Sequence, residues 1–265
     1  MKQLLKTLGL AAIVTATVAC TDKIETPKGH GEVIVSANSS PKVSLKNVTS
    51  GDKVYTIEGV TLPTSDNLSL EIISDEDNSK QSWATITEFG SEKRYFTEGV
   101  YTIKVAHGDS TIEGYDIAPY FYGEKKISVT ARQVTKAEIS ACIGHSLVNV
   151  ECTEKFNSYF TSAEFKISTL AGGEFEVTLP MTKNLFICPQ QFAITCTAVK
   201  QTGEEIALPK QIFTEVNPQT RYTVKFDVAE AGGATIQISL NDTIVGNVTI
   251  ETELNDDALP ELIKL

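Results

Sequence analysis

The sequence predicts an all-β protein: two tandem antiparallel β-sandwiches of transthyretin or immunoglobulin type after a lipoprotein signal peptide. Runs of roughly four to eight residues alternate apolar and polar side chains and recur about every ten residues. They are rich in Val, Ile, Thr and Tyr, and they end at Gly, Pro, Asn, Asp or Ser. Helical periodicity is almost absent, and about sixteen runs are too many for one seven-stranded sandwich.

The composition excludes several classes of protein. Of 265 residues, 41% are hydrophobic and 22% are charged, which argues against global disorder. The net charge of -11 disfavours a nucleic-acid partner, because such proteins need a basic surface to replace phosphate counterions. Three histidines leave little room for a metal hydrolase, and we expect neither a metal nor a cofactor.

The first 19 residues have the features of a signal peptide. Lys2 and Lys6 form a basic start, and Leu8–Ala19 is an uncharged apolar run too short to span a membrane. The end of this segment, Thr17–Cys20, resembles the lipobox of bacterial lipoprotein precursors, although the commonest form has Leu where Thr17 stands. Cys20 is therefore the candidate lipidation site, and the lipid would attach the chain to a membrane. The alternative is a plain secretory signal followed by an incidental cysteine.

The mature chain divides into four predicted parts. Residues 20–31 are polar, contain Pro and Gly, and read as a lipidated tether. Residues 32–136 form the first predicted sandwich and residues 137–252 the second, with a hinge near 132–142. Residues 253–265 form a C-terminal tail.

The expected strands follow from the alternation in each part. In the first sandwich they are Glu32–Ala37, Lys42–Val48, Lys53–Glu58, Leu68–Ile73, Val100–Ala106 and Lys125–Ala131. In the second they are Ala137–Ile143, Leu147–Cys152, Ala163–Ser168, Glu174–Leu179, Gln191–Val199, Glu205–Leu208, Lys210–Glu215, Arg221–Val228, Ala234–Leu240 and Ile244–Thr252. Ala171–Gly173 and Gln201–Glu204 are predicted hairpin loops, and Glu154–Phe160 lacks alternation, which suggests one helical turn.

The tail has two interpretations. It fits a short helix capped by Asp256 or Asp257, and it also fits an extended strand with Pro260 at an exposed edge. We expect it either to dock on the second sandwich or to add as a strand to another chain.

A family resemblance rests on several short motifs. Glu98–Ile103 has the G-x-Y-x-hydrophobic strand entry that is common in transthyretin-like and prealbumin-type sandwiches. The other residues that carry the resemblance are Trp83, Ala118–Gly123, Lys126–Ala131, Cys142 and Val148–Glu151. With its lipoprotein start, the chain resembles uncharacterised surface lipoproteins of Bacteroidetes that are related in architecture to fimbrillin-like pilus proteins.

The resemblance implies a cell-surface protein with a role in fimbria-like assembly or adhesion, and it supplies no catalytic residues. Stalk pilins of the fimbrillin type are cleaved after an Arg in an N-terminal strand. The arginines here are Arg94, Arg132 and Arg221, none near the first expected strand. That departure argues for an anchor, a tip or a stand-alone lipoprotein.

A search for catalytic and metal-binding patterns yields no catalytic residue. No serine-hydrolase elbow, zinc-protease motif or phosphate-binding loop occurs. Cys142 and His145 are close in sequence, but a packed thiol near a turn histidine is the favoured interpretation. Ser74–Asn78 has oxygen ligands at alternate positions, and a solvated hairpin turn is favoured over a calcium loop.

Three further sets of residues are candidate sites. The aromatic cluster Tyr115–Tyr122 would either stack on sugar rings or fill the core, and core filling is favoured. Ser110 and Thr243 match a short O-glycosylation pattern used by Bacteroidetes. The candidate disulfide members are Cys142, Cys152, Cys188 and Cys196, and buried free thiols are the alternative.

These observations predict a non-catalytic, lipid-anchored surface protein for fimbria-like assembly or adhesion. Its expected partners are the membrane, through the lipid, and a pilus or surface protein. The alternative function is a glycan-binding lipoprotein for nutrient capture, and an enzyme ranks third because no acid–base constellation is visible.

Overall fold

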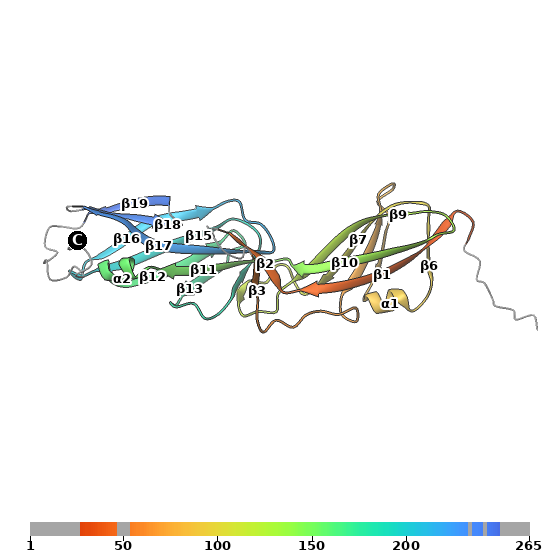
Figure 1. Ribbon diagram of the computed structural model, residues 1–265, viewed down its shortest axis with the longest axis horizontal. Helices are drawn as coiled ribbons and strands as arrows, with labels where there is room; N and C mark the ends of the chain where they lie inside the picture. The colour runs from red at the N-terminus through yellow and green to blue at the C-terminus, as the bar shows by residue number, and fades with distance from the viewer. Residues whose placement is uncertain (1–26, 47–53, 233–234, 241–242, 250–265) are drawn as a thin grey trace, which may run out of the picture.

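The computed structural model describes residues 27–46, 54–232, 235–240 and 243–249. Within these residues the chain forms strands β1–β19 and two short helices, which confirms the all-β class. The strands form three sheets in two elongated lobes that lie end to end (Figure 1). We call the seven-stranded sheet with its core the N-terminal lobe, and the eight- and four-stranded sheets the C-terminal lobe.

The N-terminal lobe is a single sheet with strand order β5-β4-β7-β9-β10-β1-β6. In chain order its strands are β1 (His30–Ser40), β4 (Ser69–Ser74), β5 (Lys80–Trp83), β6 (Arg94–Thr97), β7 (Gly99–His107), β9 (Phe121–Val129) and β10 (Val134–Ile143). Alternate side chains of these strands are buried, as the sequence pattern predicts.

This sheet curls around its own core. Trp83 on β5 and Phe96 on β6 belong to opposite edges, yet their ring centroids are 6.5 Å apart. Helix α1 (Ile86–Gly90) fills the gap between the edges with Phe89, whose ring lies 4.8 Å from that of Trp83. The helix begins at Thr85, whose hydroxyl accepts the N–H of Glu88 at 3.0 Å. The lobe is therefore one curled sheet, whereas the sequence predicted two facing sheets.

The C-terminal lobe has two sheets that face each other. The larger contains β2 (Lys42–Lys46), β3 (Val54–Thr56), β8 (Gly114–Tyr115), β11 (Ser146–Cys152), β14 (Leu185–Ile187), β17 (Thr220–Gly232), β18 (Thr235–Leu240) and β19 (Thr243–Thr249). The smaller contains β12 (Phe160–Thr169), β13 (Glu174–Val177), β15 (Phe192–Lys200) and β16 (Glu205–Phe213).

One apolar core joins these two sheets. Phe165 on β12 and Phe226 on β17 come from different sheets, and their ring centroids are 4.9 Å apart. Phe156, on helix α2 (Glu154–Tyr159), contacts both of these rings. The helical turn predicted for residues 154–160 is thus confirmed, and it closes one end of this core.

Both predicted hairpin loops are confirmed. Residues 170–173 join β12 to β13, and residues 201–204 join β15 to β16. Gly172 and Gly203 have φ angles of 96° and 87°, a conformation that favours glycine over residues with a Cβ atom.

The expectation of purely antiparallel sheets is wrong. β1 pairs with β10 in parallel, and β17 pairs in parallel with both β11 and β2. The reason lies in the path of the chain (Figure 1). β1 and β10 run side by side toward the C-terminal lobe and continue there as β2 and β11, so both members of the pair keep the same direction.

The junction between the lobes is crossed by several segments. The chain passes from the N-terminal to the C-terminal lobe at Pro41, between β1 and β2, and at Gly144, between β10 and β11. It also crosses after β7, where β8 joins the larger sheet and pairs with β14. Leu147 and Phe186 of the C-terminal lobe are part of the N-terminal lobe's buried apolar cluster. The division of the chain at residue 136 stays a prediction; β10 keeps its pairing with β1 as far as Cys142.

Some predicted features lie outside the described residues: the signal peptide, Cys20 and the tail at residues 253–265. In the part of the chain that the structure describes, no helix has the length and apolarity that crossing a membrane requires.

Candidate functional site

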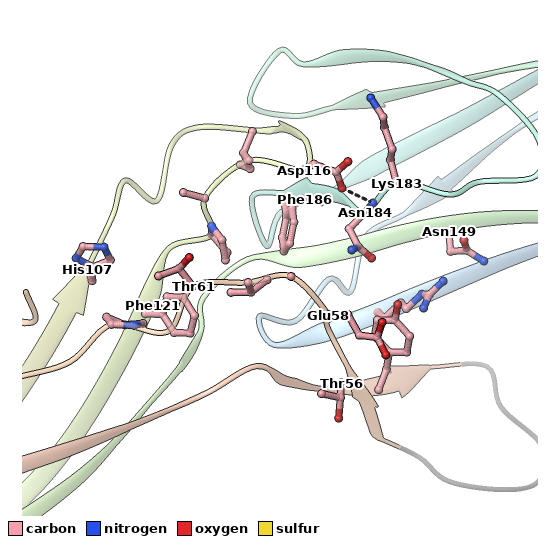
Figure 2. A pocket seen from close by; sticks show the side chains of 18 of the residues that line it. Thr56, Glu58, Thr61, His107, Asp116, Phe121, Asn149, Lys183, Asn184 and Phe186 are labelled. Atoms are coloured by element: carbon pink, nitrogen blue, oxygen red, sulfur yellow. Dashed lines mark hydrogen bonds between the residues drawn. The ribbon is translucent and has the colours of Figure 1, made fainter.

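A polar cleft of about 720 Å³ lies at the junction of the two lobes, and we call it the junction cleft. Its walls come from residues of the segments 55–63, 116–121 and 181–186, with Asn149 on β11 and Arg221 on β17. Figure 2 shows His107 at one end of the cleft and Asn149 at the other. This volume is within the range of small-ligand sites, about 300–1,000 Å³.

Strand pairing places Arg221 beside Tyr55. β2 lies between β17 and β3, with Leu45 opposite Arg221 and Val43 opposite Tyr55. Val43 and Leu45 are two residues apart, so all four side chains are on one face of the sheet. The guanidinium carbon of Arg221 lies 4.1 Å from the centre of the Tyr55 ring. Such a cation–π contact fixes the half-buried guanidinium at the wall of the cleft.

The opposite wall is fixed by a reciprocal pair of hydrogen bonds. The N–H of Asp116 donates to the carbonyl of Asn184 at 2.9 Å, and the N–H of Asn184 donates to Oδ1 of Asp116 at 3.0 Å (Figure 2). Asp116 has a φ angle of 49°, a conformation that Asp adopts more readily than most residues. The bonds extend the β8–β14 pairing, so this wall is part of the sheet framework.

A second hollow of about 690 Å³ adjoins the junction cleft and shares Asn149, Met181 and Arg221 with it. The Asn149 side chain is only 7% exposed, and its Nδ2 donates to Glu151 at 2.8 Å. The sulfur of Met181 accepts the N–H of Val150 at 3.0 Å, which holds the shared wall against β11. The two hollows together form an extended, solvent-open depression.

The chemistry of the cleft suits binding. Its hydroxyl and amide side chains are Tyr55, Thr56, Thr61, Asn67, Asn149, Thr182 and Asn184. Glu58 and Asp116 bring negative charge, and Lys183 and Arg221 bring positive charge. Nδ1 of His107 is bonded to the carbonyl of Asn67 at 2.8 Å, so this nitrogen carries the proton and is not available as a base. Polar groups of this kind recognise hydroxyl-rich or charged ligands.

The four cysteines predicted as candidate disulfide members are free thiols in the structure. Cys152 and Cys196 both contact the C-terminal lobe's core, and burial raises the pKa of each to about 12. Burial, together with the nearby Glu113 carboxylate, raises the pKa of Cys188 to about 11. Cys142 is half-buried on β10. The disulfide stays a prediction.

His145 does not pair with the Cys142 thiol. It is completely buried, and its Nδ1 accepts the backbone N–H of Tyr120 at 3.0 Å.

The members of the aromatic cluster have different surroundings. Phe121 is buried, Tyr120 stacks on Tyr122, and the Tyr115 hydroxyl donates to the carbonyl of Glu176 at 2.7 Å.

The segment Ser74–Asn78 is the turn between β4 and β5. Protein donors engage its carboxylates: Lys126 pairs with Asp75 at 2.6 Å, and the N–H of Ser79 donates to Asp77 at 3.0 Å. No cluster of three or more metal-ligating side chains occurs within the described ranges.

The two candidate O-glycosylation residues lie in different parts of the fold. Ser110 lies in the loop between β7 and β8, and Thr243 begins β19. Their O-glycosylation stays a prediction.

The sequence analysis missed Tyr55, Asn149 and Arg221 as site residues. They are far apart in the chain, and only the parallel pairing of β17 with β2 and β11 brings them together. No local spacing signals this arrangement.

A family model described as a domain of unknown function (DUF4493) matches residues 29–256 of the chain. None of the curated proteins matches it significantly.

Three of the solved structures that the chain resembles come from Bacteroides species. A proposed polysaccharide-binding protein of Bacteroides thetaiotaomicron is 8% identical, with a TM-score of 0.37 and coverage of 84% of this chain and 100% of the other. A proposed cell adhesion protein of Bacteroides eggerthii is 8% identical, with a TM-score of 0.37 and coverage of 86% and 97%. A proposed adhesin of Bacteroides thetaiotaomicron is 11% identical, with a TM-score of 0.34 and coverage of 85% and 99%.

Proposed function

Since the chain belongs to the family described as a domain of unknown function (DUF4493), we propose that it is a non-catalytic, lipid-anchored protein of the outer-membrane surface. Its role is adhesion or fimbria-like assembly. The lipid on Cys20 attaches the chain to the membrane, and the several acyl chains of a bacterial lipoprotein hold it firmly.

The observation that carries this proposal is the end-to-end arrangement of the lobes. β1 begins at the outer end of the N-terminal lobe, and β10 and β1 both run toward the C-terminal lobe (Figure 1). An anchor that precedes His30 would therefore hold the molecule by one end. The junction cleft and the C-terminal lobe would then project away from the membrane, where a partner could reach them.

The several chain crossings at the junction would resist separation of the two lobes under force. The chain crosses the junction after the parallel strands β1 and β10, and β8 pairs back into the larger sheet. Leu147 and Phe186 add apolar contacts to the N-terminal lobe's core. A rigid rod of this kind transmits force between an anchored end and a bound end without opening at the middle.

The test compares host cells that carry the gene, lack it, or carry it with Cys20→Ala. We expect loss of adhesion or of pilus assembly without the gene, and restoration by the native gene alone. Unchanged adhesion and assembly in the deletion strain would contradict the proposal.

The second candidate function is capture of glycans by a surface lipoprotein, and the junction cleft favours it. Its amide and hydroxyl side chains can bond to sugar hydroxyls, and its volume suits a small ligand. Binding of the purified protein to a glycan array is the test, and a blank array would contradict this candidate while leaving protein-mediated adhesion intact.

A further inference from the structure

We propose that the junction cleft binds an oligosaccharide that carries a carboxylate, and that Arg221 pairs with this carboxylate. The inference rests on the glycan-binding candidate above and specifies its ligand class. Three features support it: the fixed guanidinium of Arg221, the two adjoining hollows that it lines, and the polar side chains of their walls.

Arg221 brings a positive charge, held in position by Tyr55, to the wall of the junction cleft. Arg221 is a half-buried residue, and its guanidinium carbon lies 4.1 Å from the Tyr55 ring centre. It forms no ion pair with any carboxylate of the described residues. A guanidinium presents a planar set of donors that matches a carboxylate with two parallel hydrogen bonds. Because the ring already restricts its orientation, little further ordering is needed on binding.

The position of Arg221 suits a chain-like ligand. It lines both the junction cleft and the adjoining hollow, together with Asn149 and Met181. A sugar unit whose carboxylate is paired with Arg221 can therefore have neighbours on both sides. One neighbour would lie along residues 56–61 and the other toward Asn157.

The walls on both sides offer groups for sugar hydroxyls. Asn149 uses its Nδ2 to bond Glu151, and no donor of the described residues occupies its Oδ1. Thr56, Thr61 and Asn184 add hydroxyl and amide groups around the cleft. Such groups fit a polyol, whereas acidic peptides are typically bound by clusters of arginines. Arg221 is the one arginine among the described residues that line the two hollows.

The local charge is compatible with an anionic ligand. Glu58 and Asp116 are balanced by Lys183 and Arg221 among the lining residues, whereas the whole chain has a net charge of -11. The adjoining hollow adds the carboxylate of Glu151, which accepts the Asn149 amide. Across the described residues of both hollows three carboxylates therefore face two cations, a local charge close to neutral compared with that of the whole chain.

The test is calorimetric titration of the detergent-purified protein with trigalacturonic acid and with its trimethyl ester. The two probes share their rings and linkages and differ in the carboxylates. We expect the acid to bind at least about tenfold more tightly than the ester, as the loss of a charge-assisted hydrogen bond implies. Arg221→Gln should remove this preference, and a urea unfolding curve equal to that of wild type shows that the variant is folded.

Arg132→Gln is the matched control, because Arg132 lies in the β9–β10 turn, outside both hollows. Equal binding of acid and ester, or an unchanged preference in Arg221→Gln, would overturn the proposal while glycan binding stands. If neither probe binds, the proposal is overturned. The glycan array then decides whether glycan capture remains a candidate function. Equally tight binding of a hexaglutamate peptide would overturn the saccharide class.

Discussion

Nδ1 of His145 accepts a hydrogen bond from the backbone N–H of Tyr120 at 3.0 Å, with the imidazole completely buried. The bond joins the segment before β9 to the crossing between β10 and β11. Nε2 approaches the carbonyl of Ile112 but forms no well-aligned hydrogen bond. Burial lowers the pKa of His145 below its usual 6.5, although Ile112, Glu113 and Asp109 oppose this shift.

Protonation of His145 should make the protein less stable in mild acid. Below about pH 6.5 the unfolded chain takes up a proton at His145 that the folded chain resists. The unfolded state then binds more protons, so the free energy of unfolding falls as the pH falls from 6.5 toward the lowered folded pKa. Urea unfolding at about pH 7.5 and 5.5 measures the difference.

His145→Gln should reduce this pH dependence, whereas His107→Gln, a matched change at a half-buried histidine, should preserve it. An equal pH dependence in wild type and His145→Gln would show that other groups cause the acid sensitivity.

A methyl group at Gly123 should destabilise the N-terminal lobe. Its Cβ would lie 2.5 Å from the carbonyl oxygen of Ser140 on the neighbouring strand β10. Backbone atoms in a sheet cannot move aside easily, so Gly123→Ala should cost about 1–3 kcal/mol in the free energy of unfolding. Gly90→Ala is the control, because nothing lies within 4 Å of its added carbon. Equal stability of both variants by urea unfolding would contradict the strand packing described here.

The buried thiols should react slowly in the native protein. The thiolate is the reactive form, and the pKa values of about 12 for Cys152 and Cys196 leave little of it at about pH 8. Iodoacetamide should therefore label these two and Cys188 only after denaturation. Mass spectrometry of the denatured, alkylated protein counts the labels, and a disulfide between Cys152 and Cys196 would remove two of them.

Limited proteolysis should spare strand β10 (Val134–Ile143). β10 pairs with β1 from Val134 to Cys142, and the two lobes are also linked through β2 and β8. Cleavage requires an exposed, unpaired backbone, which this strand does not offer. We expect one resistant piece that contains both lobes. Two stable pieces divided within 132–142 would instead support the boundary predicted from the sequence.

Much of the fold was predictable because strand alternation is a local property. β7, β11 and β15 appear in the sequence as alternating runs, and Gly172 and Gly203 mark hairpins through their backbone freedom. The short strands β5, β6 and β14 were missed. Their three or four residues are too few to show alternation, and long-range pairing defines them.

The parallel pairs and the junction cleft were not predictable for a related reason. Arg221 meets Tyr55 only because β2 is inserted between β17 and β3 after the chain has crossed between the lobes. The spacing of residues in the sequence does not indicate where the chain crosses between lobes or which distant strands pair. The lipidation motif expected at Thr17–Cys20, in contrast, is contiguous, so it can be predicted without any structure, and it stays a prediction.

The central claim is that Cys20 anchors this protein at the cell surface, and one experiment tests it directly. Intact cells that produce wild type or Cys20→Ala are treated with external proteinase K, then fractionated and probed for the protein. We predict that wild type is membrane-bound and cleaved from outside, and that Cys20→Ala is no longer membrane-bound. Protection of wild type in intact cells, or membrane association of Cys20→Ala, would contradict the account.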